Sequence, residues 1–81
     1  NTNGYCDLDV CFADTPAGKW LAADAHEYGF IIRFPDNKAD ITGYQYEPWH
    51  IRYVGIALAK KLQDTRQTME EYFDLPAAPS Y

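Results

Sequence analysis

The segment Phe30-Ile31-Ile32-Arg33-Phe34-Pro35 is a run of β-branched and aromatic residues that ends at a proline. Such residues are typical of a β-strand, and proline disfavours the interior of one because it has no backbone N–H to donate. A second strand is predicted over 49–54, where Trp49, Ile51 and Tyr53 share one face. Two strands joined by a loop of this length are expected to be antiparallel neighbours.

A helical pattern precedes the first strand. Thr15 is a natural N-cap, Pro16 suits the first helical position and Gly29 suits the position after the last turn, so we expect a helix over 16–28. Its apolar face, read at spacings of three and four residues, consists of Ala17, Trp20, Leu21, Ala25 and Tyr28.

The periodicity becomes helical again after Gly55. Ile56, Ala59 and Leu62 fall on one face of an expected amphipathic helix. The sequence Thr68-Met69-Glu70-Glu71 matches the capping box, in which a threonine side chain and a glutamate side chain satisfy each other's backbone N–H groups. It predicts a last short helix.

The segment between the two strands is expected to be mostly loop. Residues 35–40 have turn chemistry, and Ile41-Thr42 is expected to begin a further short strand. The order helix, strand, strand, helix, helix predicts an α+β fold in which helices pack on a small antiparallel sheet. We divide the chain into a loop at 1–13, a core at 14–75 and a tail at 76–81.

The composition excludes some classes of function. With 81 residues and 47% apolar residues, the chain can form one small domain with a modest core. Its net charge is −5, and its 7 Lys and Arg residues are scattered, whereas a nucleic-acid surface needs clustered cations. We therefore expect no nucleic-acid partner. Uncharged apolar runs such as Tyr28 to Ile32 are far too short for a transmembrane segment.

The two cysteines leave three possibilities open. Cys6 and Cys11 could form a disulfide that closes a small loop, supply half of a metal site, or remain ordinary thiols. The sequence does not choose among these readings.

The densest group of candidate functional residues is 43–50, which reads Gly-Tyr-Gln-Tyr-Glu-Pro-Trp-His. In an unbroken strand Glu47 and His50 would point to opposite faces. Pro48 lacks a ladder donor and restricts the backbone before it, so we expect a bend that brings Glu47 over the face of His50. A carboxylate beside a metal-bound imidazole can activate a water molecule. Taken alone, a single histidine on a strand is more often a structural residue than a metal ligand.

The sequence gives weaker evidence for a functional role of the other charged residues and of the second histidine. Arg33 and Arg52 lie on the two expected strands, where either could pair with Glu47 or another acidic side chain, or meet a substrate carboxylate. His26 is expected at the surface of the first helix.

Three runs in order resemble VanY-type D-alanyl-D-alanine carboxypeptidases. They are Asp14-Thr15-Pro16-Ala17-Gly18-Lys19-Trp20-Leu21, Tyr28-Gly29-Phe30-Ile31-Ile32-Arg33-Phe34-Pro35 and Ile41-Thr42-Gly43-Tyr44-Gln45-Tyr46-Glu47-Pro48-Trp49-His50-Ile51-Arg52-Tyr53-Val54-Gly55. The late Glu-Glu-Tyr at 70–72 is similar too, so the likeness extends from about residue 12 to residue 73.

The resemblance implies a zinc peptidase that removes the terminal D-alanine from peptidoglycan stem peptides. The implied fold is the α+β fold of Hedgehog-type and D,D-peptidase domains. In that family the Glu of Glu-Pro-Trp-His is the general base and its His is a zinc ligand, which assigns these roles to Glu47 and His50. Tyr46 and Trp49 would line the substrate site. The substrate implies the cell envelope or the exterior, and cytoplasmic relatives that act on precursors are the alternative.

One motif of the family has no counterpart here. Its other two zinc ligands, a His and an Asp, lie in Ser-x-His-x-x-Gly-x-Ala-x-Asp, whereas the histidines of this chain are His26 and His50. We therefore expect residues 1–81 to be the C-terminal part of a single catalytic domain, inactive alone, with the missing N-terminal part as a partner that supplies the remaining Zn²⁺ ligands. Alternative ligands within the chain would be Cys6, Asp7, Asp9 and Cys11.

Two functions remain as hypotheses. The first is a zinc-dependent D,D-carboxypeptidase. The second is a non-catalytic peptidoglycan- or peptide-binding module on the same scaffold, in which the aromatic residues from Tyr44 to Tyr53 hold a ligand without cleaving it.

Overall fold

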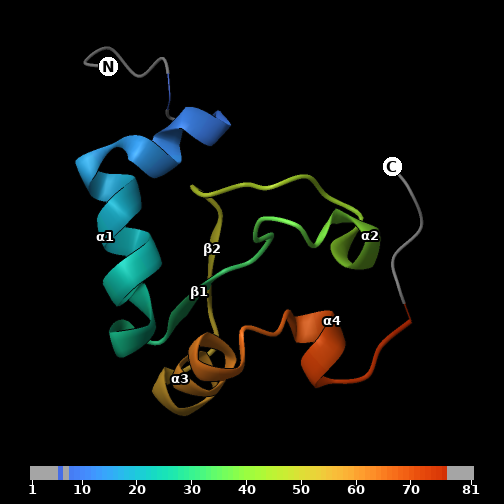
Figure 1. The fold of residues 1–81 in the computed structure, drawn as a ribbon. Coiled ribbons are helices and arrows are strands. Elements are labelled where there is room, and N and C mark those ends of the chain that lie inside the picture. Colours follow the sequence, from blue (N-terminus) through green and yellow to red (C-terminus); the bar gives the residue numbers. More distant parts are fainter. Residues whose placement is uncertain (1–5, 7, 77–81) are drawn as a thin grey trace.

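The computed structural model describes residues 6 and 8–76, and Figure 1 shows their arrangement. Two strands cross the middle of the molecule, with α1 on one side of them, α2 and α4 on the other, and α3 below. The elements in chain order are η1 (Val10–Asp14), α1 (Pro16–Asp24), η2 (Ala25–Tyr28), β1 (Phe30–Ile32), α2 (Ala39–Thr42), β2 (Ile51–Tyr53), α3 (Ile56–Thr65) and α4 (Met69–Tyr72), where η denotes a 3₁₀-helix. The predicted α+β fold is confirmed.

The sheet is antiparallel, as expected. Phe30 pairs with Tyr53 and Ile32 pairs with Ile51. Both strands are shorter than predicted. The described residues form only these two strands. Within this part of the chain, each strand therefore has one edge that is not paired with another strand.

The first helix begins where the sequence predicts. The Thr15 hydroxyl accepts a hydrogen bond from the Gly18 N–H at 3.0 Å, and the chain reverses at Gly29, whose φ of 91° suits a glycine. The last predicted turn is the 3₁₀-helix η2 instead of α-helix. The predicted apolar face is partly wrong. Trp20 and Tyr28 are exposed and their rings lie against each other at 5.6 Å, whereas Ala25 is buried.

The short strand expected at Ile41-Thr42 is wrong, because these residues end helix α2. Gly43 has a φ of 82° and donates its N–H to the Ala39 carbonyl at 2.9 Å, which closes a helical turn. Thr42 is buried and bonds the backbone of Tyr44 in both directions, at 3.1 Å each. The left-handed glycine therefore outweighs the β-propensity of two residues.

The two C-terminal helices are confirmed. Helix α3 packs on η2 and β1 and buries Ala59 and Leu62, although Ile56 of the predicted apolar face is exposed. Helix α4 has a complete capping box: the Thr68 hydroxyl accepts from the Glu71 N–H at 3.0 Å, and the Glu71 carboxylate accepts from the Thr68 N–H at 2.9 Å. The buried hydrophobic residues are Ala25, Phe34, Ala59 and Leu62, together with Pro48.

The two cysteines form a disulfide, which decides among the three readings left open by the sequence. The described part of the predicted loop at 1–13 includes most of η1, where the Asp9 carboxylate accepts the Val10 N–H at 2.7 Å. Asp7 and most of the predicted tail at 76–81 lie outside the described residues. Among the helices that the structure describes, none has the length and apolar character to cross a bilayer.

Candidate active site

The candidate site is built on a tight turn that links the central loop to β2. The His50 N–H donates to the Glu47 carbonyl at 3.0 Å, so residues 47–50 form a β-turn with Pro48 at its second position. Pro48 is fully buried, and its fixed φ suits that position. The turn explains why β2 begins at Ile51 and not at Trp49.

The turn brings the two predicted functional side chains together. Glu47 Oε1 lies 3.1 Å from His50 Nδ1, and the side chains are 25% and 45% exposed respectively. The bend predicted from Pro48 is therefore present. A partly buried carboxylate and an accessible imidazole thus meet at one point, where a ligand can approach both.

A buried aromatic ring lies behind this pair. Phe34 contacts the His50 ring edge-on at 4.8 Å and stacks on Tyr44 at 4.3 Å. The Glu47 N–H also donates to the Phe34 carbonyl at 2.9 Å. Phe34 therefore contacts both members of the candidate site, one through its ring and one through its backbone.

The side chains of the Glu47–His50 pair are of the types that bind metal ions, but they are too few to form a complete site. An imidazole nitrogen and a nearby carboxylate fit zinc, but in residues 6 and 8–76 no group of three or more His, Cys, Asp or Glu residues could hold one. The alternative that Cys6 and Cys11 complete the site is wrong, since a disulfide sulfur is not a thiolate ligand. Within the described residues, the Glu47–His50 pair is therefore not part of a complete zinc site.

The two expected substrate-binding residues occupy different environments. Trp49 is half-buried within the turn, between Glu47 and His50. Tyr46 instead lines a pocket of about 320 Å³ to which neither Glu47 nor His50 contributes. Burial raises the pKa of the Tyr46 phenol, and the charges of Asp36 and Asp14 act in the same direction, so the phenol remains protonated. The structure therefore places Tyr46 against a pocket that Glu47 and His50 do not line.

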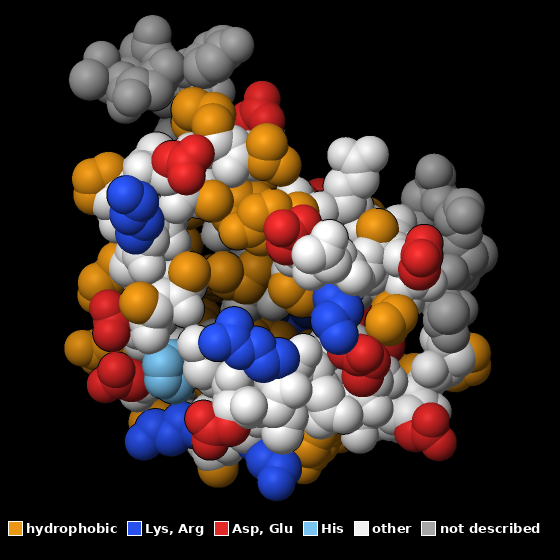
Figure 2. Space-filling model, viewed as in Figure 1, with side chains coloured by type: hydrophobic (Ala, Val, Ile, Leu, Met, Phe, Trp, Pro, Cys, Tyr) orange, Lys and Arg blue, Asp and Glu red, His pale blue; other side chains and the backbone are white. Residues whose placement is uncertain are grey.

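His26 is less exposed than its predicted surface position implies. It lines the same pocket as Tyr46, and its Nδ1 atom is buried without a hydrogen-bond partner in the described structure. Figure 2 shows hydrophobic side chains gathered around a hollow on one face of the molecule, with charged side chains at its rim. His26 is separate from the Glu47–His50 turn.

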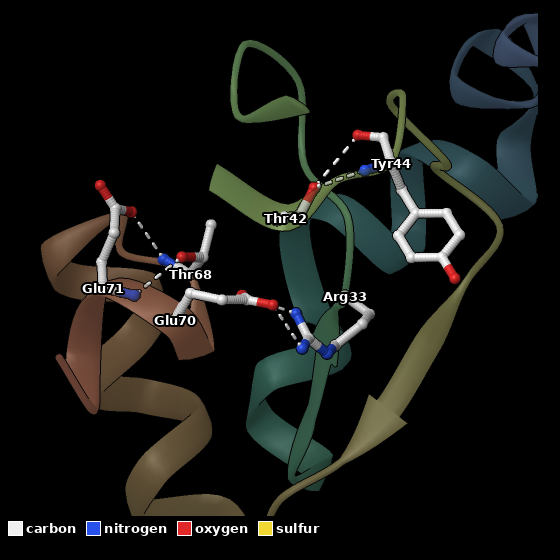
Figure 3. Close-up of polar contacts among 6 residues, drawn as sticks. All are labelled: Arg33, Thr42, Tyr44, Thr68, Glu70 and Glu71. Atoms are coloured by element: carbon white, nitrogen blue, oxygen red, sulfur yellow. Dashed lines mark hydrogen bonds and ion pairs between the residues drawn. The ribbon is translucent and has the colours of Figure 1, made fainter. Parts of the chain in front are cut away.

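Sequence reasoning missed the acidic partner of Arg33. In Figure 3 the Glu70 side chain reaches from α4 to the Arg33 guanidinium, with two hydrogen bonds of 2.9 and 2.7 Å. Hydrogen bonds from Arg33 lower the pKa of the Glu70 carboxyl, and burial only partly opposes them. Arg52, by contrast, is exposed. The only sequence signal for Glu70 was its place in the capping box beside Glu71.

Comparison with known proteins gives consistent matches. The profile of the VanY family, described as D-alanyl-D-alanine carboxypeptidase, matches residues 1–56. The YodJ protein of Bacillus subtilis (strain 168) is 55% identical over 73 residues, which are 90% of this chain and 26% of that protein. A D-alanyl-D-alanine carboxypeptidase of Enterococcus faecium is 49% identical over 59 residues, 73% of this chain and 20% of that protein. The chain thus spans about a quarter or less of these relatives.

Solved structures match with similar coverage. The LdcB LD-carboxypeptidase has a TM-score of 0.80 and 51% identity, over 91% of this chain and 34% of that one. VanYB in complex with D-alanine-D-alanine has a TM-score of 0.70 and 43% identity, over 72% and 32%. A VanY mutant in complex with Zn(II) has a TM-score of 0.67 and 45% identity, over 69% and 32%.

Proposed function

Because the chain belongs to the VanY family of zinc-dependent D-alanyl-D-alanine carboxypeptidases, we propose that it forms the C-terminal part of a catalytic domain that trims peptidoglycan stem peptides. Glu47 is the general base and His50 is a zinc ligand. The observation that carries this proposal is the 3.1 Å approach of Glu47 Oε1 to His50 Nδ1 on a turn fixed by a buried proline.

The chain's own residues have defined tasks in this proposal. When bound, zinc polarises the scissile carbonyl and makes water a stronger acid. His50 supplies a neutral imidazole nitrogen, and the edge-on contact with Phe34 limits rotation of its ring. Glu47 takes a proton from the attacking water and delivers it to the amine of the departing D-alanine as the C–N bond breaks. The partial burial of Glu47 shields this proton transfer from bulk water.

The remaining metal ligands are proposed to come from outside this chain. A catalytic zinc usually has three protein ligands, and the described residues offer one. The segment of the whole protein that carries the family's His and Asp motif is the proposed source. The exposed hydrophobic residues of this chain support such a partner. They include Leu8, Trp20, Tyr53, Ile56 and Phe73.

The substrate is proposed to be a stem peptide that ends in D-alanine. VanYB binds D-alanine-D-alanine, which supports cleavage between two D-residues. The likeness to LdcB, described as an LD-carboxypeptidase, is higher in identity and TM-score and supports a second candidate, cleavage between an L-centre and the terminal D-alanine. The two scissile bonds differ in the configuration of the residue that precedes the terminal D-alanine.

The proposed location is the cell envelope or the exterior. LdcB is described as recognising peptidoglycan, and the Cys6–Cys11 disulfide suits an oxidising environment.

The test uses the full-length protein that contains this chain, with peptides ending in D-Ala-D-Ala and peptides with a single terminal D-alanine. We expect the wild type to release D-alanine, and Glu47→Gln to lower the rate about 10²–10⁴-fold while retaining zinc by elemental analysis. Glu27→Gln, at an exposed position in η2, is the matched control and should match the wild type.

Three outcomes separate the readings. A normal rate in Glu47→Gln would show that Glu47 is not the base. Wild-type protein that binds both peptides and cleaves neither would identify the non-catalytic binding module. The peptide that is cleaved faster decides between the D,D and the L,D activity.

A further inference from the structure

We propose that Arg33 and Glu70 are positioning residues that set the relative placement of Glu47 and His50, so that helix α4, remote in sequence, controls the active-site turn. This inference rests on the proposed function only for its effect on the rate; the structural coupling stands independently of it.

The first step concerns the backbone of residues 33 and 34. The Arg33 N–H donates to the His50 carbonyl at 2.9 Å, and the Phe34 carbonyl accepts from the Glu47 N–H at 2.9 Å. Two consecutive residues therefore hold both ends of the β-turn. A displacement of this dipeptide moves Glu47 and His50 together or pulls them apart.

The second step concerns what holds the dipeptide itself. Strand β1 ends at Ile32, so Arg33 and Phe34 lie beyond the paired register of the sheet. The Arg33 side chain is fixed by the two-bonded ion pair with Glu70, and both side chains are largely buried, at 18% and 10% exposure. The guanidinium carbon also lies 5.1 Å from the centre of the Phe34 ring, which contacts His50. One side chain thus connects α4 with both contacts to the turn.

The third step is that the geometry of this ion pair is specific. A planar guanidinium with two parallel hydrogen bonds to a carboxylate fixes orientation as well as distance, which a lysine cannot do. Helix α4 presents Glu70 in a defined place because the capping box fixes its first turn (Figure 3). The capping box thus places Glu70, Glu70 orients Arg33, and Arg33 in turn holds the β-turn at residues 47–50.

A second ion pair of the same helix provides the control. Lys38 Nζ contacts both oxygens of Glu71 at 2.9 and 3.0 Å, and each side chain is 27% exposed. Like Arg33, Lys38 ties α4 to the central loop. In the described structure, Lys38 forms hydrogen bonds with residues of α2 and α4 and not with residues 47–50. Removal of Lys38 therefore loosens α4 without a direct effect on the turn.

The experiment compares Glu70→Gln with Lys38→Met in the full-length protein. The first readout is hydrogen exchange at the Arg33 and Glu47 amides in metal-free protein, since both amides donate to the bonds that define the turn. We expect exchange about tenfold faster or more in Glu70→Gln and little changed in Lys38→Met. The second readout is steady-state kinetics. We expect kcat to fall about tenfold or more in Glu70→Gln with KM within about threefold, because misplacement of catalytic groups affects the transition state most.

Arg33→Lys is the second variant, in case Glu70→Gln does not fold. It keeps the charge and loses the planar fork, so kcat and amide protection should fall in the same direction by a smaller factor. Unchanged exchange and kcat in Glu70→Gln, or in Arg33→Lys if the former is unfolded, would overturn the inference. Equal losses in Lys38→Met would also overturn it, since they would indicate general loosening of α4. If the wild type cleaves no peptide, the proposed function fails, and the amide exchange alone still decides the coupling.

Discussion

Two carboxylates of this chain each contact a basic side chain, and the difference between their surroundings suits one to a structural role and the other to the proposed chemical role. Glu70 uses both oxygens on Arg33, in a pair whose side chains are 10% and 18% exposed. Glu47 uses one oxygen on His50, and the imidazole is 45% exposed. The Glu70 pair has little remaining capacity for a ligand. The Glu47 pair keeps an accessible imidazole, which a reactive site requires.

The largest expected effect follows from removal of the imidazole. His50→Ala in the full-length protein should lower zinc content to a small fraction of the wild-type value, and D-alanine release by about 10³-fold or more, because zinc would lose one of its proposed ligands. The stability of the metal-free protein should change little, since the side chain is exposed. His26→Ala is the control and should retain zinc. Loss of zinc in His26→Ala alone would place the metal in the pocket that His26 lines.

The next effect concerns the structural pair. Glu70→Leu should lower the free energy of unfolding by about 2–3 kcal/mol, because it leaves the Arg33 guanidinium largely buried without a partner. Arg33→Met combined with Glu70→Leu should be less destabilised than Glu70→Leu alone. Urea denaturation measures both. Lys38→Met, which breaks the more exposed pair, should cost about 0–1 kcal/mol. An equal cost for the two pairs would remove the distinction drawn between them.

A smaller effect is expected at the helix start that presents Glu70. Thr68→Ala removes the acceptor of the Glu71 N–H and should cost about 1 kcal/mol in the same denaturation assay. Thr65→Ala is the matched control, because its exposed hydroxyl bonds a carbonyl of its own helix. A larger loss from Thr65→Ala would show that the capping box is not what fixes α4.

The smallest effect is a gradual dependence of stability on pH. Hydrogen bonds from Arg33 lower the pKa of Glu70, and a hydrogen bond from Lys38 lowers that of Glu71, below the ordinary 4.5. The unfolded chain therefore binds protons first, so this stabilisation is complete above about pH 4.5 and is lost as the pH falls through the folded-state pKa values. Urea midpoints between pH 6 and pH 3 should decrease less in Glu70→Gln than in the wild type. Parallel decreases would assign the acid sensitivity to other groups.

Structural features formed by residues within about four positions of each other in the chain were predictable from the sequence. The Thr15 cap, the reversal at Gly29, the capping box at Thr68 and the bend at Pro48 all depend on local backbone chemistry. The approach of Glu47 to His50 was predictable for the same reason, since three residues separate them.

Features that depend on long-range packing were not predictable. Arg33 and Glu70 lie 37 positions apart, and both arginines of the predicted strands were open to several partners. Tyr46 immediately precedes Glu47, yet it lines a pocket that Glu47 does not line, because local sequence does not specify which side of an irregular segment a side chain faces. The extent of burial of Trp20 and Tyr28 was likewise not predictable from helical periodicity.

The two-stranded sheet has a consequence for the behaviour of this chain in concentrated solution. An unpaired strand edge can recruit the edge of another molecule, and the net charge of −5 supplies the repulsion that keeps such molecules apart. Added salt screens that repulsion over roughly 10 Å at about 0.1 M. Ionic strength therefore governs the colloidal behaviour of the isolated chain, which should stay dispersed longest in dilute buffer.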